Sequence, residues 1–210
     1  MAFSITNSTI TQVGYYFINS AYNLWIYLVM RTVIKITQFI FLGLLTAAVG
    51  EWQFSVFLRD DLDNFIGSVV FNTLYMIGVY LVTRLLLTTL RNRPKFILFY
   101  VVLFGFTGLM VEWFLIGNSP WGNPDASLPG MFAYWACMAL VPLMFLMGNH
   151  HLQTFIIRYA LVYIALALLG QFAIPSPDWR FAFHIYAVIL GYLGLMVAIL
   201  WKYLQPGSKT

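Results

Sequence analysis

Two glutamates are the residues of this sequence best suited to chemistry, and each is followed by a tryptophan. Glu51 lies in TAAVGEW and Glu112 in TGLMVEW, so both match T-x4-E-W, and the chain has no other glutamate. If the two carboxyl groups converge, their repulsion favours sharing one proton, which suits acid–base chemistry, proton coupling or cation binding. The structural alternative is that each glutamate binds loop amides while its tryptophan anchors at a membrane interface.

A third candidate is His184, because it is the only histidine near the predicted outer ends of the helices. It could carry protons or bind a ligand, or it could simply satisfy its hydrogen bonds at the interface. Gln171 belongs to the same set, since aligning FILFY at residues 96–100 with FIIRY at residues 155–159 places it opposite Glu112. We therefore take Glu51, Glu112 and His184 as candidate catalytic residues.

The turn-rich segment GNSPWGNPDASLPG suggests an ordered loop over the outer opening of a cavity. Its tryptophan, with two others nearby, could form an aromatic lid, although an interfacial aromatic belt explains the same residues. The candidate ligand-binding residues are Trp52, Trp113, Asn118, Trp121, Trp135, Gln171 and Arg180. No zinc, P-loop or nucleophile-elbow motif occurs, and the single cysteine excludes an intramolecular disulfide, so the sequence names no metal or cofactor.

The elements that must position these residues are membrane-spanning helices. The chain has 210 residues, of which 61% are hydrophobic and 9% charged, whereas soluble domains have about a quarter charged residues. Apolar runs of the length needed to span a bilayer recur along it. The predicted spans are residues 34–54, 65–87, 96–116, 131–148, 154–173 and 181–201. The sequence thus predicts an all-α integral membrane protein with a bundle of six transmembrane helices at residues 33–203.

The N-terminal segment, residues 1–32, is harder to assign. Residues 13–30 contain asparagines and a serine that are costly in hydrocarbon, together with tyrosines and a tryptophan that favour an interface. We expect an amphipathic helix lying on the membrane surface. A seventh span is the alternative, and residues 204–210 are expected to form a short cytoplasmic tail.

Charge predicts the orientation of the spans. One set of loops and helix ends holds nine basic residues: Arg31, Lys35, Arg84, Arg91, Arg93, Lys95, Arg158, Lys202 and Lys209. The other side holds Arg59 and Arg180. This bias places both termini in the cytoplasm of a multi-pass protein of the cell membrane. All seven acidic residues fall at or beyond the outer ends of the spans.

The two alignments also suggest an internal repeat, which would make the bundle three helical hairpins of about 60 residues each. The leading functional hypothesis is binding of a lipid-like or isoprenoid-like molecule in an outward-facing, aromatic-lined cavity, with acid–base chemistry as an extension. A proton- or cation-coupled transporter is one alternative. A non-catalytic subunit that binds a partner membrane protein or a second copy is another. Membrane lipids are expected partners, and the net charge of +4 does not indicate nucleic acid.

Overall fold

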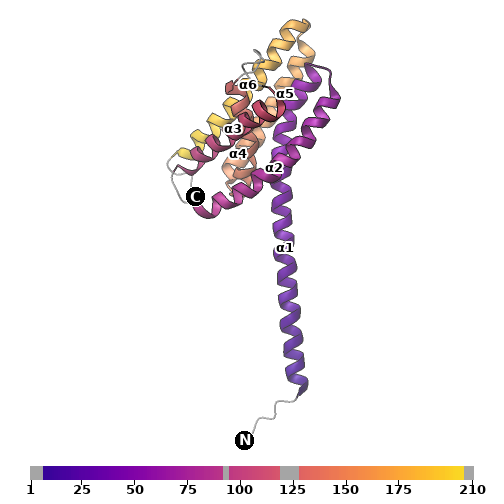
Figure 1. Ribbon diagram of the computed structural model, residues 1–210, viewed down its shortest axis with the longest axis vertical. Helices are drawn as coiled ribbons and strands as arrows, with labels where there is room; N and C mark the ends of the chain where they lie inside the picture. The colour runs from indigo at the N-terminus through magenta and orange to yellow at the C-terminus, as the bar shows by residue number, and fades with distance from the viewer. Residues whose placement is uncertain (1–6, 92–94, 119–127, 206–210) are drawn as a thin grey trace. The chain divides into compact units, whose positions relative to one another are not determined.

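The computed structural model describes residues 7–91, 95–118 and 128–205, with side chains from residue 24 onward, and every element within these ranges is a helix (Figure 1). The elements are α1 (Asn7–Glu51), η1 (Trp52–Phe57), α2 (Leu62–Leu90), α3 (Phe96–Val111), η2 (Glu112–Ile116), α4 (Leu128–Leu146), α5 (His150–Ala173) and α6 (Pro177–Leu204). The chain divides into two compact units, residues 1–38 and 39–210. The second unit contains the end of α1 and all later elements.

Within the described residues, six helical segments are long and apolar enough to cross a membrane. They are Leu24–Phe57, Leu62–Leu90, Phe96–Ile116, Leu128–Leu146, His150–Ala173 and Pro177–Leu204. Each of the six apolar segments predicted from the sequence falls on one of these, so their number and helical character are confirmed.

The N-terminal region is helical from residue 7 onward, since Asn7–Glu51 is assigned as α-helix throughout. The boundary between the two compact units falls within this stretch, after residue 38, and a surface position for residues 1–32 stays a prediction. The stretch long and apolar enough to cross begins at Leu24.

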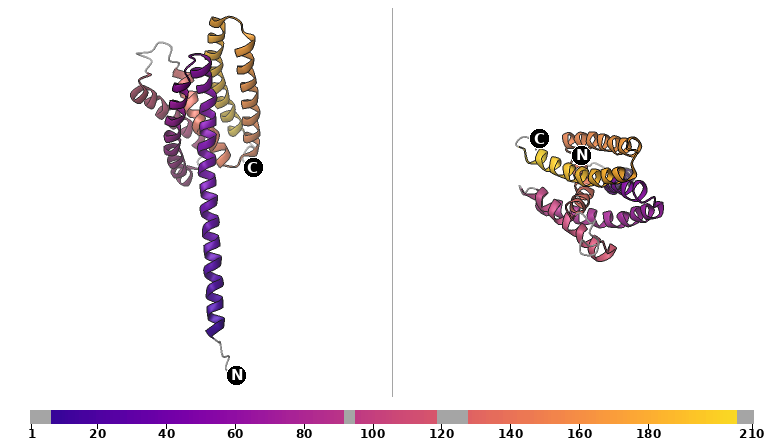
Figure 2. Two further views of the ribbon diagram at one scale, coloured as in Figure 1. Left: turned by 90° about the vertical axis from the view of Figure 1, so that its right-hand side faces the viewer. Right: turned by 90° about the horizontal axis from the view of Figure 1, so that it is seen from above.

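Helix α4 forms the centre of the second unit. Almost every residue from Ala133 to Met144 is buried, and the helix contacts α2, α3, α5 and α6. Seen from above, α4 lies between α3 on one side and α6 on the other (Figure 2). Glycines on α3 permit the close approach, because Gly105 faces the Phe132 ring and Gly108 faces the Trp135 ring with no room for a Cβ. Small residues at helix contacts are typical of membrane bundles.

Local sequence signals explain where the helices begin and end. The Asp61 side chain accepts a hydrogen bond from the Asn64 backbone at 2.8 Å and caps α2. Asn149 caps α5 in the same way through the Leu152 backbone at 3.1 Å. Gly117, with a φ of 78°, ends η2 in the left-handed region that glycine adopts without strain.

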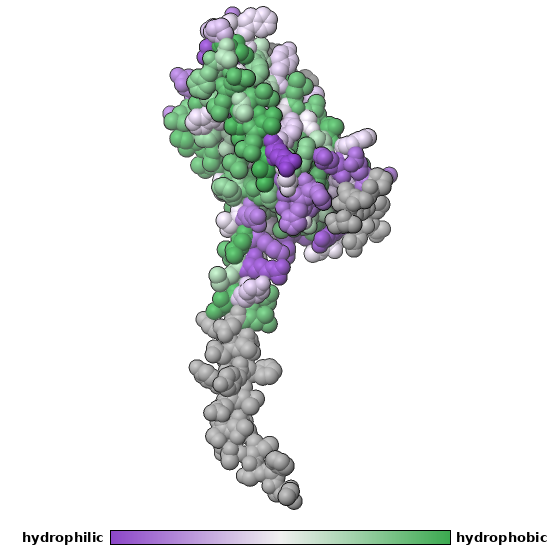
Figure 3. Space-filling model, turned by 180° about the vertical axis from the view of Figure 1, so that it is seen from behind, coloured by the Kyte–Doolittle hydropathy of each residue, from purple (hydrophilic) through white to green (hydrophobic). Residues whose placement is uncertain are grey.

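The sides of the helices are apolar where they face outward. Large hydrophobic side chains are exposed along α2, α3, α5 and α6, and the face shown in Figure 3 is hydrophobic along the helices, with hydrophilic residues gathered toward their ends. A soluble protein rarely exposes so much contiguous apolar surface.

Candidate functional site

A π-helical turn occurs at each of the two Glu-Trp pairs. Helix α1 ends at Glu51 and continues as η1, while α3 ends at Val111 and continues as η2, which begins with Glu112. The wider π turn rotates the residues that follow, and in η1 it buries Gln53 and Ser55. Such turns are rare and are frequent at functional sites.

The Glu51 carboxylate is held inside the bundle. Its Oε1 accepts a hydrogen bond from the Tyr134 hydroxyl of α4 at 2.9 Å. The Asn72 side chain of α2 donates to the same hydroxyl at 3.3 Å. The hydroxyls of Ser55 and Ser68 also interact with this carboxylate, so the carboxylate is well supplied with donors.

Glu112 is bound by the neighbouring residue of α4. Its Oε1 accepts a hydrogen bond from the Trp135 indole at 3.1 Å, and its Oε2 accepts one from the Asn118 side chain at 3.2 Å. The consecutive residues Tyr134 and Trp135 therefore each hold one glutamate. Both carboxylates are thus held by the same helix, and a direct contact between them stays a prediction.

His184 lies in a second polar cluster, fully buried on α6. Its Nδ1 lies 3.3 Å from Gln53 Oε1, and its Nε2 lies 3.0 Å from Gln171 Oε1. Gln53 Nε2 also donates to the Tyr163 hydroxyl at 2.8 Å. The structure thus places His184 in contact with Gln171, which was predicted as a ligand-binding residue. Among the described residues, no hydrogen bond joins His184 directly to Glu51 or Glu112.

The candidate tryptophans that the structure describes lie in different surroundings, and a lid formed with Trp121 stays a prediction. Trp135 is buried and stacks edge-on against Tyr75 with ring centroids 4.6 Å apart. Trp52 is half-exposed and packs against Phe65 at 5.2 Å. Trp113 is half-buried beside Glu112 on η2, and Trp121 lies outside the described residues.

Arg180 has a local structural contact. Its guanidinium donates to the backbone oxygens of Ile174 at 3.3 Å and Pro175 at 3.4 Å. It therefore ties the start of α6 to the end of α5, and its predicted role in ligand binding has no contact that supports it. Among the described residues, no group of three His, Cys, Asp or Glu side chains is arranged to hold a metal ion.

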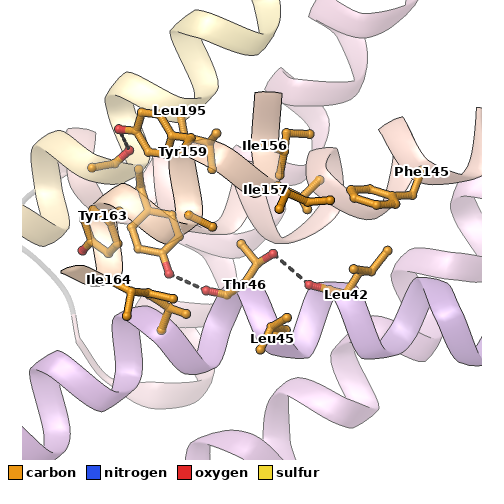
Figure 4. Close-up of a pocket in the computed structure, with 15 residues that line it drawn as sticks. Leu42, Leu45, Thr46, Phe145, Ile156, Ile157, Tyr159, Tyr163, Ile164 and Leu195 are labelled. Carbon is orange, nitrogen blue, oxygen red and sulfur yellow. Dashed lines mark hydrogen bonds between the residues drawn. The ribbon is translucent and has the colours of Figure 1, made fainter. Parts of the chain in front are cut away.

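Two apolar cavities lie along α1 and η1. The first, of about 160 Å³, is lined by residues of α1, α4, α5 and α6, and Figure 4 shows Leu45 and Thr46 of α1 facing Tyr159 and Tyr163 of α5. The second, of about 300 Å³, is bounded by α1, η1, α2 and α5 and includes Trp52, Phe57 and Phe65.

The two cavities are neighbours along α1 and α5, since Val49 of α1 and Ile164 of α5 line both. We call the combined space the α1–α5 cleft. It extends from Leu42 to Phe57, and fifteen residue steps of 1.5 Å make it about 22 Å long. None of its lining residues carries a charge, and Gln53 lines the part formed by η1.

Sequence reasoning missed the residues that connect these groups. Tyr134 lies in a uniformly apolar run, and Asn72 carried no motif that separates it from an ordinary helix-packing residue. Gln53 follows Glu51 by two positions, which on a regular α-helix would face it away from Glu51. Only the π turn and the central position of α4 reveal their roles.

Comparison of the chain with family models, curated proteins and solved structures finds no match.

Proposed function

We propose that this chain is a multi-pass membrane protein that holds a lipid-like or isoprenoid-like molecule in the α1–α5 cleft. The observation that carries the proposal is the cleft itself, two adjacent cavities without a charged lining residue that share Val49 and Ile164. Its length of about 22 Å exceeds the roughly 15 Å of hydrocarbon in one leaflet. A single acyl or isoprenoid chain therefore fits along it.

The six apolar helices and their exposed hydrophobic sides support insertion in a membrane. The nine basic residues at one end of the helices, against two at the other, support an orientation with both termini in the cytoplasm of a cell membrane. In that orientation the Gln53 end of the cleft is its outer end.

Gln53 supports a polar anchor for the ligand at this end. Its side chain contacts His184 and Tyr163, and these groups supply neutral hydrogen-bond partners in an apolar site, the arrangement that orients small ligands. Neither glutamate is among the lining residues of the cleft. Acid–base chemistry on the ligand by Glu51, Glu112 and His184 therefore stays a prediction, and the geometry supports binding better than catalysis.

The test is mass spectrometry of molecules that co-purify with the protein in mild detergent, for the wild type and two tryptophan variants. Ile164→Trp fills the junction of the two cavities. Val162→Trp is the matched control, because Val162 lies on the same helix, 61% exposed and outside the cleft. We expect a stoichiometric apolar molecule with the wild type and with Val162→Trp, and its loss from Ile164→Trp. The same bulk lipid in all three samples would contradict the proposal and favour a subunit that binds partner helices.

A further inference from the structure

A third space, of about 780 Å³, is lined only by α5, by α6 and by Ile174, the residue that follows α5. None of its lining residues is charged. Three of them are exposed at the surface, because Trp179, Tyr186 and Leu190 are 73%, 64% and 61% exposed. We call this space the α5–α6 groove. In the six-span arrangement it opens sideways, toward the hydrocarbon of the bilayer.

The α5–α6 groove and the first cavity of the α1–α5 cleft have a common wall. Tyr159, Tyr163 and Gly191 line both spaces. The rest of the cavity wall includes residues of α1 and α4, whereas the groove contacts neither helix. Gly191 contributes no side chain to the wall, and the Tyr163 ring occupies the place where a Cβ would project. Two tyrosine rings, one turn apart on α5, therefore make up most of the wall at this level (Figure 4).

Each of the two rings is held in the wall by a hydrogen bond to a different element. The Tyr159 hydroxyl donates to the Gly191 backbone oxygen of α6 at 2.8 Å. The Tyr163 hydroxyl accepts from Gln53 Nε2 of η1, also at 2.8 Å. Both tyrosines are half-buried, so each side chain has a face on the open groove into which it can rotate. Breaking one hydrogen bond releases one ring, and Gly191 places no side chain behind it.

We propose that a lipid-like or isoprenoid-like molecule binds first in the α5–α6 groove, from the bilayer, and passes between α5 and α6 at Tyr159 and Tyr163 into the α1–α5 cleft. This inference rests on the proposed function, whose ligand it brings to its site. Both spaces have uncharged, largely apolar linings, so the same molecule suits both. Entry from the side keeps its hydrocarbon chain out of water throughout, which avoids the cost of exposing apolar surface.

The test is the rate at which a long-chain alcohol that carries a diazirine reaches the cleft of the purified protein in liposomes. The alcohol is mixed in, the sample is flashed after increasing delays, and modification of Val49 is measured by mass spectrometry. Val49 lines both cavities of the cleft and is not part of the groove. Ala187→Trp fills the groove one turn before Gly191 and leaves the cleft unchanged, because Ala187 lines the groove alone.

Ala187→Trp should slow modification of Val49 roughly tenfold or more, since the new ring must move aside before the alcohol passes. The final extent should equal that of the wild type, which shows that the variant is folded. Ala165→Trp is the matched control, because Ala165 is an exposed residue of α5 that lines none of the three spaces. It should react at the wild-type rate.

Tyr159→Phe tests the wall in the opposite direction. Without its hydrogen bond to Gly191 the ring is released more easily, and Val49 should react roughly two- to tenfold faster. Equal rates in Ala187→Trp, Ala165→Trp and the wild type, with Val49 modified to the same final extent, would overturn the entry route and leave the cleft as a binding site. An unchanged rate in Tyr159→Phe would also overturn the route through this wall. No modification of Val49 in the wild type at any delay would overturn the proposed function and the route together.

Discussion

At the residue scale, the central feature is that neighbouring residues of one helix hold both glutamates. Tyr134 and Trp135 donate to Glu51 and Glu112 at 2.9 and 3.1 Å. A buried carboxylate is costly unless donors satisfy it. The buried donors on α4 are therefore part of what allows two acidic groups to lie inside an apolar bundle.

Trp135→Phe should destabilise the protein by about 1–3 kcal/mol, because it leaves one oxygen of the Glu112 carboxylate without its indole donor. Trp52→Phe is the control, since this half-exposed ring packs edge-on against Phe65. The substitution should change stability little. Unfolding in detergent measures both variants. Equal stability of the two variants would contradict the role assigned to Trp135.

The contacts of Gln53 also predict the tautomer of His184. Both ring nitrogens face an amide oxygen, Nδ1 that of Gln53 and Nε2 that of Gln171, so neutral His184 can donate to only one of them. The Gln53 amide is the one fixed by other contacts, because its Nε2 donates to Tyr163 and to the Val49 backbone oxygen at 3.4 Å, so its Oε1 is the expected acceptor. We expect a protonated Nδ1, measured by nitrogen-15 NMR of histidine-labelled protein. His184→Asn assigns the signal among the three histidines. A bare Nδ1 in His184 would show that the Gln53 amide has the opposite orientation.

At the scale of elements, the helices were predictable and their contacts were not. Runs of about 20 apolar residues determine the positions of the six long helices, because only helices satisfy the backbone in such segments. The same uniform apolarity hides which face of α4 contacts which neighbour, so Tyr134 could not be distinguished from other tyrosines.

The pairing of the two T-x4-E-W segments was a useful prediction at this scale. It pointed to Glu51 and Glu112, which accept hydrogen bonds from consecutive residues of α4 and each lie at the start of a π turn. The third member of the proposed repeat, Gln171, lies instead with His184. Repetition over three hairpins stays a prediction.

Gly108→Ala should disrupt the α3–α4 contact, because the added methyl would overlap the Trp135 ring and displace the donor to Glu112. Gly78→Ala is the matched control on α2, where the added methyl meets no atom. It should stabilise the helix by up to about 1 kcal/mol. Thermal unfolding of both variants tests this, and two changes of the same sign would contradict the packing described.

At the scale of the whole molecule, we propose a bundle that crosses a membrane six times with its acidic residues outside. The short connections between consecutive helices make the helix ends alternate between two sides. Charge then decides which side faces the cytoplasm.

Single cysteines at Asp63, Asp178, His151 and Lys202 test this topology in a Cys137→Ala background, since all four positions are exposed. A membrane-impermeant maleimide added to intact cells should label positions 63 and 178. Positions 151 and 202 should react only after permeabilisation. Labelling of position 63 and position 151 from the same side would contradict six spans in the order described.

The most direct test of the central claim is photo-crosslinking with a long-chain alcohol that carries a diazirine, followed by mass spectrometry of the modified residues. We expect modification concentrated on the residues that line the α1–α5 cleft, including Leu45, Val49, Ile164 and Leu168, and suppressed by excess unlabelled alcohol. Modification spread evenly over the outward-facing residues of all helices, with no suppression by competitor, would show that the alcohol contacts the protein only as bulk lipid does. That result would contradict a ligand site in the cleft.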